Sequence, residues 1–203
     1  VEINNNNISC IIVEPIQCTN GDRYFPKKFF TGIREITKKY DIPLIFDEIQ
    51  TGFCASGKKW YYEHTNIQPD ILIFGKKTQT SGIMVNKKFS NIFKTPIRLE
   101  VTWDGDIVDM VRCKYIIKAF QKENVLLNVN KMAKIFNEGL KDIDLINNVR
   151  NSGLLFAFDL NSKIDINKFS QKLFLNQMLC NPTGNHTIRL RPHLLVKKSE
   201  IYE

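Results

Sequence analysis

Two strand-like segments of this chain end in charged residues, which restricts the folds that it can adopt. The first segment, residues 43–48, reads Pro-Leu-Ile-Phe-Asp-Glu, and the second, residues 70–77, reads Asp-Ile-Leu-Ile-Phe-Gly-Lys-Lys. Each is a short apolar run of the kind that forms a buried strand in a parallel sheet. Open α/β sheets bind ligands at the carboxyl ends of their strands. The pattern predicts an α/β fold in which an acid and an amine meet at one edge of the sheet.

An acid from one strand and an amine from the next suit a cofactor that needs a charge partner and a covalent anchor. Pyridoxal phosphate is such a cofactor. The segments around this pair also fit an α/β sheet. Residues 9–13 form an apolar run, apolar residues recur at helical spacing after Pro26, and the run ending at Asp47 follows. This order predicts a strand, a helix and a second strand parallel to the first.

The charge and the cysteines narrow the class of protein. The chain has 203 residues and a formal net charge of +8, but its lysines are scattered in pairs and not interleaved with aromatic residues. We therefore expect no nucleic-acid partner. No apolar run reaches the roughly 18 residues of a membrane span, so we expect no membrane partner. The five cysteines lack a C-x-x-C pattern and the three histidines lack metal-ligand spacing. Free thiols, a cytoplasmic location and no metal site are expected.

The sequence changes character after Thr102. Helical patterns over 106–123 and 126–140 are followed by an apolar strand over 154–160, a helix over 165–177, and strands near 178–180 and 187–191. Asp106 is predicted to cap the first of these helices. We expect two domains, with residues 1–105 in the larger one and residues 106–203, a connector helix and a smaller α+β region, in the second. The second domain is expected to be truncated at its end.

Five segments, taken in order, resemble the class III aminotransferases, which are fold-type I pyridoxal-phosphate enzymes. These segments are Val13–Gln17, Ile45–Gly52, Phe74–Gln79, Thr102–Trp103 and Ile188–Pro192. The Gly-Lys-Lys-Thr-Gln string from residue 75 and the stretch over 98–103 are most similar to the L-lysine 6-aminotransferase branch. The resemblance runs from about residue 9 to the end. It implies the second half of a mostly parallel large-domain sheet, followed by a small α+β domain.

The resemblance assigns Lys76 and Asp47 to catalysis and cofactor binding. Lys76 is implied to be the Schiff-base lysine, whose released amine then moves a proton between substrate and cofactor. Asp47 is implied to face the pyridine nitrogen and keep it protonated. Gln50 is implied to reach the phenolic oxygen of the cofactor. Lys77 is the alternative for the covalent role, because the spacing alone does not choose between two adjacent lysines.

Two further roles follow from the resemblance. Thr102 is implied to bind the cofactor phosphate of the neighbouring subunit, which implies a homodimer with shared active sites. Arg189 is implied to clamp a substrate carboxylate, since guanidinium matches carboxylate as a two-bond fork. Arg191 lies two residues further on, on the same face of a strand, and remains a rival for this role.

The chain departs from the family pattern at several positions. Thr19 stands where the family has a glutamate that can pair with the substrate-binding arginine, so the switch between two substrates is in question. Asp104 and His193 replace a glycine and a proline of the family. The glycine-rich phosphate loop, the ring-stacking aromatic residue and a second carboxylate-binding arginine of the family have no match. The chain therefore resembles only the C-terminal portion of such an enzyme.

The implied reaction transfers the ε-amino group of L-lysine to 2-oxoglutarate, giving 2-aminoadipate 6-semialdehyde and L-glutamate. Its partners would be amino-acid and 2-oxo-acid substrates and a second copy of the chain. Two alternatives remain open. The amino donor is ornithine, acetylornithine or 4-aminobutyrate, or the chain is a catalytically inactive fragment that keeps only a dimerisation surface.

Overall fold

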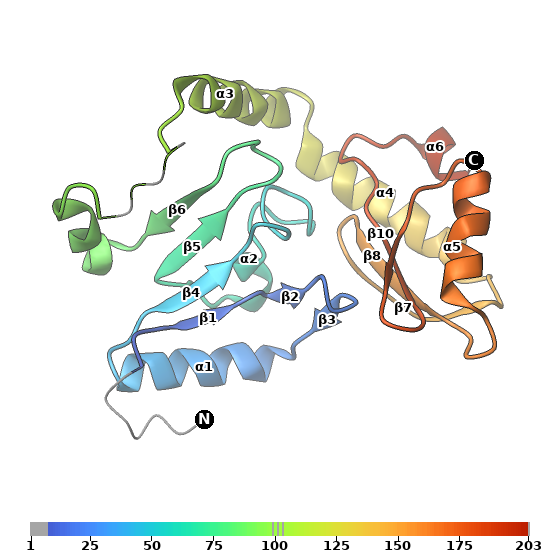
Figure 1. The fold of residues 1–203 in the computed structure, drawn as a ribbon, viewed down its shortest axis with the longest axis horizontal. Helices are drawn as coiled ribbons and strands as arrows, with labels where there is room; N and C mark the ends of the chain where they lie inside the picture. Colours follow the sequence, from blue (N-terminus) through green and yellow to red (C-terminus); the bar gives the residue numbers. More distant parts are fainter. Residues whose placement is uncertain (1–7, 99, 101, 103, 203) are drawn as a thin grey trace. The chain divides into compact units, whose positions relative to one another are not determined.

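The computed structural model describes residues 8–98, 100, 102 and 104–202. The chain divides into two compact units, each of which is described by itself (Figure 1). Unit 1 consists of the segment ending at Pro15, Phe25–Gln50 and Tyr61–Ala119, and unit 2 consists of Ile16–Tyr24, Thr51–Trp60 and the chain from Phe120 onward. The units do not follow the expected domains 1–105 and 106–203. We keep residue 105 as a proposed boundary between functional domains.

Unit 1 is built around a four-stranded sheet. Its strands are β1 (Ile11–Val13), β4 (Leu44–Asp47), β5 (Ile71–Phe74) and β6 (Gly82–Val85), adjacent in that order. β1, β4 and β5 run parallel, and β6 pairs antiparallel to β5. The predicted α/β class with a mostly parallel sheet is confirmed. Strands that are apolar runs with few polar side chains are typical of parallel sheets whose faces are covered by other parts of the protein.

Helix α1 (Lys27–Lys39) connects the first two parallel strands and lies along one face of the sheet (Figure 1). Its buried Phe30 packs against Phe46 of β4, with ring centroids 5.7 Å apart, and against Tyr61 at 6.4 Å. Pro26 precedes the first turn, where the missing N–H of proline costs nothing. The predicted parallel strand–helix–strand unit is therefore present.

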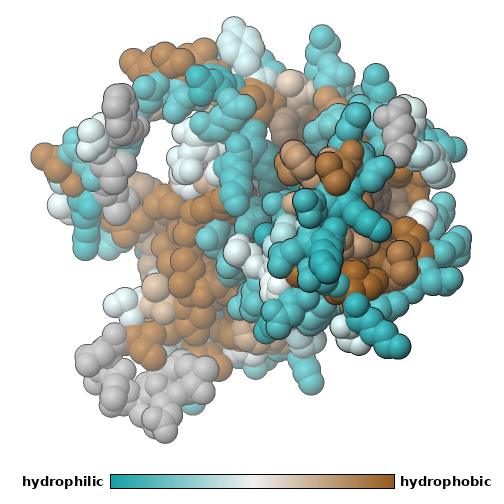
Figure 2. Space-filling model, turned by 45° about the vertical axis from the view of Figure 1, so that its right-hand side comes forward, coloured by the Kyte–Doolittle hydropathy of each residue, from teal (hydrophilic) through white to brown (hydrophobic). Residues whose placement is uncertain are grey.

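The remaining helices of unit 1 are short or exposed. α2 (Tyr62–Thr65) and the 3-10 helix η1 (Lys87–Lys94) lie in connections, and α3 (Ile107–Lys122) begins in this unit. Asp106 caps α3 as predicted, since its Oδ1 accepts the backbone N–H of Asp109 at 3.0 Å. Large apolar side chains are exposed on α3 and on the sheet, among them Ile12, Met84, Ile107, Val108 and Tyr115. Figure 2 shows hydrophobic side chains gathered on the left of the view.

Unit 2 contains a four-stranded antiparallel sheet with helices. Its elements are β2 (Ile16–Gln17), β3 (Arg23–Tyr24), α4 (Val125–Leu140), β7 (Ile146–Ser152), β8 (Leu155–Leu160), α5 (Ile166–Leu175), β9 (Asn181–Thr183), β10 (Thr187–Leu190) and α6 (Lys198–Tyr202). The sheet order is β7-β8-β10-β9. The strand expected near 178–180 lies at 181–183, and β7 and the β2–β3 ribbon were not predicted.

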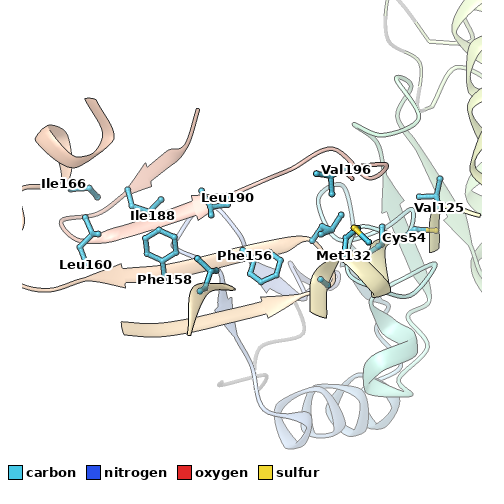
Figure 3. Packing of buried hydrophobic residues seen from close by; sticks show 14 residues of the cluster. Cys54, Val125, Met132, Phe156, Phe158, Leu160, Ile166, Ile188, Leu190 and Val196 are labelled. Atoms are coloured by element: carbon cyan, nitrogen blue, oxygen red, sulfur yellow. The ribbon is translucent and has the colours of Figure 1, made fainter. Parts of the chain in front are cut away.

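The core of unit 2 forms where the sheet meets α4. Phe156, Phe158, Ile188 and Leu190 of the sheet are buried together with Met132 of α4 (Figure 3). Burial of one such side chain contributes roughly 1.5–3 kcal/mol. This core supports β8 and β10. Arg189 lies within β10, and Arg191 follows its last residue.

A close approach of two backbones explains why residues 51–60 belong to unit 2. Gly153 has a φ of +55°, and a Cβ there would lie 2.4 Å from the Ala55 carbonyl oxygen. The backbone N–H of Leu154 donates to the same carbonyl at 3.0 Å, and the Ser152 hydroxyl donates to the Ser56 carbonyl at 2.8 Å. Only glycine fits this turn, and its small size lets the β7–β8 connection pack directly against the loop that follows β4.

Candidate active site

The predicted acid and amine lie at the same edge of the unit 1 sheet. Asp47 is the last residue of β4, and Lys76 follows the end of β5 by two residues. The two strands are parallel neighbours, and Asp47 is paired with Ile73. Both groups therefore stand at the carboxyl ends of adjacent strands, as Figure 1 allows the reader to follow. This is the edge where parallel sheets bind ligands.

Gly75 follows the last residue of β5 and precedes Lys76. A Cβ on this buried residue would lie 2.8 Å from the hydroxyl oxygen of Ser81 and 3.6 Å from Cγ1 of Ile49. A side chain would therefore crowd the Ser81 hydroxyl, whereas its distance to Ile49 would be an ordinary van der Waals contact. Glycine at residue 75 leaves room for Ser81 beside the residue that precedes Lys76.

The two adjacent lysines have different environments. Lys76 is exposed and has a φ of +56°, which places it in a turn closed by the Gln79 N–H on the Lys76 carbonyl at 2.9 Å. The amine of Lys77, by contrast, donates to the backbone carbonyl of Gln50. Lys77 therefore ties the loop after β5 to the loop after β4, and Lys76 is the more accessible of the two amines.

Asp47 is held by its own loop. Its Oδ1 accepts the backbone N–H of Ile49 at 3.0 Å, and the side chain is partly buried. Such a bond two residues along the chain restricts the rotation of the carboxylate. The arrangement provides a fixed acceptor at the strand end, suitable for a cationic or protonated ring nitrogen.

The other residues of unit 1 that the sequence analysis singled out lie in loops and turns. Gln50 lies three residues after Asp47 in the same loop, partly buried. Thr102 is an exposed turn residue, and Asp104 is exposed as well. Trp103, and with it part of the motif over 98–103, lies outside the described residues. In the described part of the chain no hydrogen bond joins Thr102 to Asp47 or Lys76, so its role at a phosphate stays a prediction.

Glu48 has a structural role that the sequence did not reveal. Its side chain is 1% exposed, and its carboxylate accepts the backbone N–H groups of Tyr61 at 2.6 Å and Tyr62 at 3.0 Å. These donors lie at the start of α2, where backbone N–H groups have no partner within the helix. Of the two adjacent acids, Glu48 therefore points inward to the backbone and Asp47 is left for the sheet edge.

We expect Glu48→Ala to lower the free energy of unfolding by about 3 kcal/mol, because it removes a buried acceptor from two backbone N–H groups. Chemical denaturation followed by circular dichroism measures the change. Glu35→Ala, on the exposed side of α1, is the matched control, with an expected change within about 0.5 kcal/mol. Equal effects of the two substitutions would contradict the role assigned to Glu48.

Arg189 and Arg191 of unit 2 differ in how their guanidinium groups are bound. Arg191 donates to the buried carboxylate of Asp22 and, at 2.9 Å each, to the carbonyls of Phe156 and Leu190. Arg189 donates to the Cys18 carbonyl at 2.9 Å. Burial lowers the pKa of the Arg189 guanidinium, and the charge of Arg191 lowers it further. Because, within the described residues, the Arg189 guanidinium makes one hydrogen bond and that of Arg191 makes three, Arg189 is the better candidate for binding a carboxylate.

Asp22 is the residue of this cluster that the sequence analysis missed. It is fully buried, and it is the only acid between Pro15 and Phe25. Its position as a single acid in a loop rich in small polar residues is the one sequence signal that could have identified it. The pairing itself joins residues 169 positions apart, which no local pattern reveals.

The residues of the sheet edge fit two parts of pyridoxal phosphate. Lys76 provides an amine for its aldehyde, and Asp47 provides a carboxylate for its ring nitrogen. The glycine at position 75, where a Cβ would collide with Ser81, leaves the backbone close to this edge. For the phosphate, Thr102 is the residue that the sequence suggests.

Comparison with known proteins identifies the family. The family model of class III aminotransferases matches residues 1–203, so the chain belongs to the class III aminotransferases. The prediction of the family and of the enzyme class is confirmed.

Within the family, the chain is similar to L-lysine-epsilon aminotransferase of Mycobacterium tuberculosis, with 35% identity over 203 residues that cover 96% of this chain and 45% of the relative. A solved structure of that lysine aminotransferase in the internal aldimine form has a TM-score of 0.89 and covers 97% of this chain and 47% of that one. The chain spans about half the length of the curated relatives that it matches.

Two other relatives have names that state different amino donors. The 4-aminobutyrate aminotransferase of Dictyostelium discoideum is 35% identical over 201 residues, covering 96% of this chain and 40% of the relative. An ornithine aminotransferase of Toxoplasma gondii, whose structure has partial occupancy of PLP at the active site, has a TM-score of 0.88 at 26% identity and covers 98% of this chain and 49% of that one.

Proposed function

We propose that this chain supplies the C-terminal part of a pyridoxal-phosphate-dependent L-lysine 6-aminotransferase. The enzyme would transfer the ε-amino group of L-lysine to 2-oxoglutarate, giving 2-aminoadipate 6-semialdehyde and L-glutamate. The single observation on which this rests is the placement of Lys76 and Asp47 at neighbouring parallel strand ends. The similarity to lysine aminotransferases and the PLP in the Toxoplasma gondii relative support the cofactor and the donor.

The bound cofactor supplies an aldehyde that links covalently to amines and a ring that accepts an electron pair. In this proposal Lys76 anchors the cofactor and, when its amine is released, accepts and returns the proton of the reacting carbon. Asp47 holds a proton on the ring nitrogen through a charge-assisted hydrogen bond. Gln50 would contact the phenolic oxygen, and Arg189 would bind the substrate carboxylate as a two-bond fork.

The proposal includes a dimer and a cellular location. Thr102, exposed in its turn, would bind the cofactor phosphate of the neighbouring subunit, which makes a complete site a property of a homodimer. A cytoplasmic location is supported by the five cysteines, none of which forms a disulfide in the described part of the chain. Among the described residues, no helix is long and apolar enough to cross a membrane.

The amino donor can be tested directly. We expect the chain to develop the visible absorption of protein-bound PLP on titration with the cofactor, and L-lysine to bleach this absorption faster than ornithine or 4-aminobutyrate. Faster bleaching by ornithine or 4-aminobutyrate would favour the second candidate function, an ω-aminotransferase for that donor, which the Dictyostelium discoideum relative supports.

The comparison with the relatives suggests a further arm for this experiment. Because the chain spans about half of their length, the titration is repeated after adding a polypeptide that corresponds to the N-terminal half of the family fold. Transaminase activity that appears only in the mixture would show that both halves form the site. If PLP binds neither to the chain alone nor to the mixture, the proposed enzymatic function is rejected and an inactive fragment is favoured.

A further inference from the structure

A buried acid without a full set of partners lies beside the candidate carboxylate site in unit 2. Asp22 is 0% exposed and lies between β2 and β3 with a φ of +51°, a conformation that is uncommon outside glycine. Its Oδ1 accepts a hydrogen bond from Arg191, and its Oδ2 has no hydrogen-bond partner within the described residues. An ionised group that is buried and half satisfied is costly, which points to a role in the cluster around it.

The contacts of the two arginines show what Asp22 does locally. One terminal nitrogen of Arg191 donates to Asp22 and the other donates to two backbone carbonyls, so both are occupied. Arg189 makes one hydrogen bond, from Nη1 to the Cys18 carbonyl, and its Nε is buried without a partner in the described part of the chain. The Nε of Arg191 is buried without a partner in the described residues as well, so the two arginines differ in their terminal nitrogens. In that part of the chain, both terminal nitrogens of Arg191 donate hydrogen bonds, whereas only Nη1 of Arg189 does.

The charges of the cluster do not cancel. Two guanidinium groups and one carboxylate leave one net positive charge, and the Cys18 carbonyl that receives Arg189 is neutral. Burial lowers the pKa of Arg189, the charge of Arg191 adds to this effect, and the charge of Asp22 opposes it. Thr19, three residues before Asp22, is exposed and carries no charge. A partly buried cluster with one excess positive charge is matched by a single carboxylate.

We propose that Asp22 is a positioning residue that engages Arg191 and thereby leaves Arg189 as the group that receives the substrate carboxylate. This inference rests on the proposed function, in which Arg189 binds that carboxylate. Asp22 sets the net charge of the pair of arginines and decides which of them is available. The substrate class that this favours is an amino or oxo acid presenting one carboxylate to Arg189.

The test uses glutarate, a dicarboxylate without a reactive carbonyl, titrated into the chain at fixed ionic strength by calorimetry. Asp22→Asn raises the net charge and releases Arg191, so we expect glutarate to bind about tenfold more tightly. Arg191→Gln removes the partner of Asp22, whose charge then acts on Arg189, so we expect binding to weaken about tenfold. The double variant should return to within about threefold of the wild type.

The opposite signs separate positioning from a structural role, because general damage to the loop would weaken glutarate binding in both single variants. Asp165→Asn, at the exposed cap of α5, changes the net charge by the same amount in the same unit and should leave the affinity unchanged. If Asp22→Asn does not fold, Arg191→Gln decides together with its unfolding midpoint. Weaker binding at an unchanged midpoint would support the proposal, and unchanged binding, or weaker binding with a lowered midpoint, would overturn it.

Arg189→Gln distinguishes this inference from the proposed function. Loss of glutarate binding in Arg189→Gln, together with unchanged binding in Asp22→Asn, would overturn the role of Asp22 only. Unchanged binding in Arg189→Gln, or no binding by the wild type, would remove the carboxylate site itself and the inference with it. PLP binding at Lys76 is measured separately and is independent of these outcomes.

Discussion

Replacing Lys76 with alanine is expected to abolish covalent capture of PLP and to lower the rate of amino transfer about 10³-fold or more, since in the proposed function this one side chain supplies both the anchor and the proton-transferring amine. The absorption of bound PLP should be absent in this variant. Borohydride reduction of the wild type followed by peptide mapping should find the cofactor on the peptide that contains residue 76.

Lys77→Ala is the matched control, because it removes the same functional group one residue further on. Lys77 donates to the Gln50 carbonyl, so its loss should loosen the loop and lower stability by about 1 kcal/mol while the PLP absorption persists. Labelling of residue 77 in place of residue 76 would reverse the assignment. Retention of the covalent adduct in both variants would place the anchor elsewhere in the chain.

Asp47→Asn is expected to slow the bleaching of bound PLP by lysine about 10²-fold or more, while the cofactor still binds covalently. Asparagine keeps a hydrogen-bond acceptor at the end of β4, but it does not carry the charge that holds a proton on the ring nitrogen. Stopped-flow absorbance measures the bleaching rate, and equilibrium titration measures PLP binding in the same samples.

Asp70→Asn provides a control on the same pair of strands. Asp70 lies just before β5, where it accepts the Leu44 N–H at 2.9 Å and pairs with Arg34 at 2.8 Å. This acid stands at the amino ends of the strands, opposite Asp47. Its substitution should reduce stability and leave the bleaching rate unchanged. An equal loss of rate in both variants would mean that Asp47 acts through the fold and not on the cofactor.

The sequence predicted the framework of the sheet edge because each element there is local. The apolar runs before Asp47 and Gly75 identify β4 and β5, and helical spacing after Pro26 identifies α1. Parallel pairing then follows from the connection between them. The different environments of Lys76 and Lys77 did not follow from the pattern, because they depend on a contact between Lys77 and Gln50, 27 residues apart.

The sequence did not predict several other structural features, and each of these failures has a physical reason. β7 reads Ile-Asn-Asn-Val-Arg-Asn-Ser, which has few strand-forming residues, and it is a strand because it pairs with the apolar β8. The β2–β3 ribbon has two residues in each strand, too few for any periodicity. The different contacts of Arg189 and Arg191 involve Cys18 and Asp22, which lie in a segment distant in the sequence.

The interleaving of the two units has a consequence for how this chain can be divided. The polypeptide passes from one unit to the other five times, after residues 15, 24, 50, 60 and 119. A single cut near residue 105 would leave the C-terminal piece without the Cys18 carbonyl, the Asp22 carboxylate and the loop that seats Gly153. The C-terminal piece would then lack two segments of its own unit, so evolution or engineering can separate these units only by rerouting several connections at once.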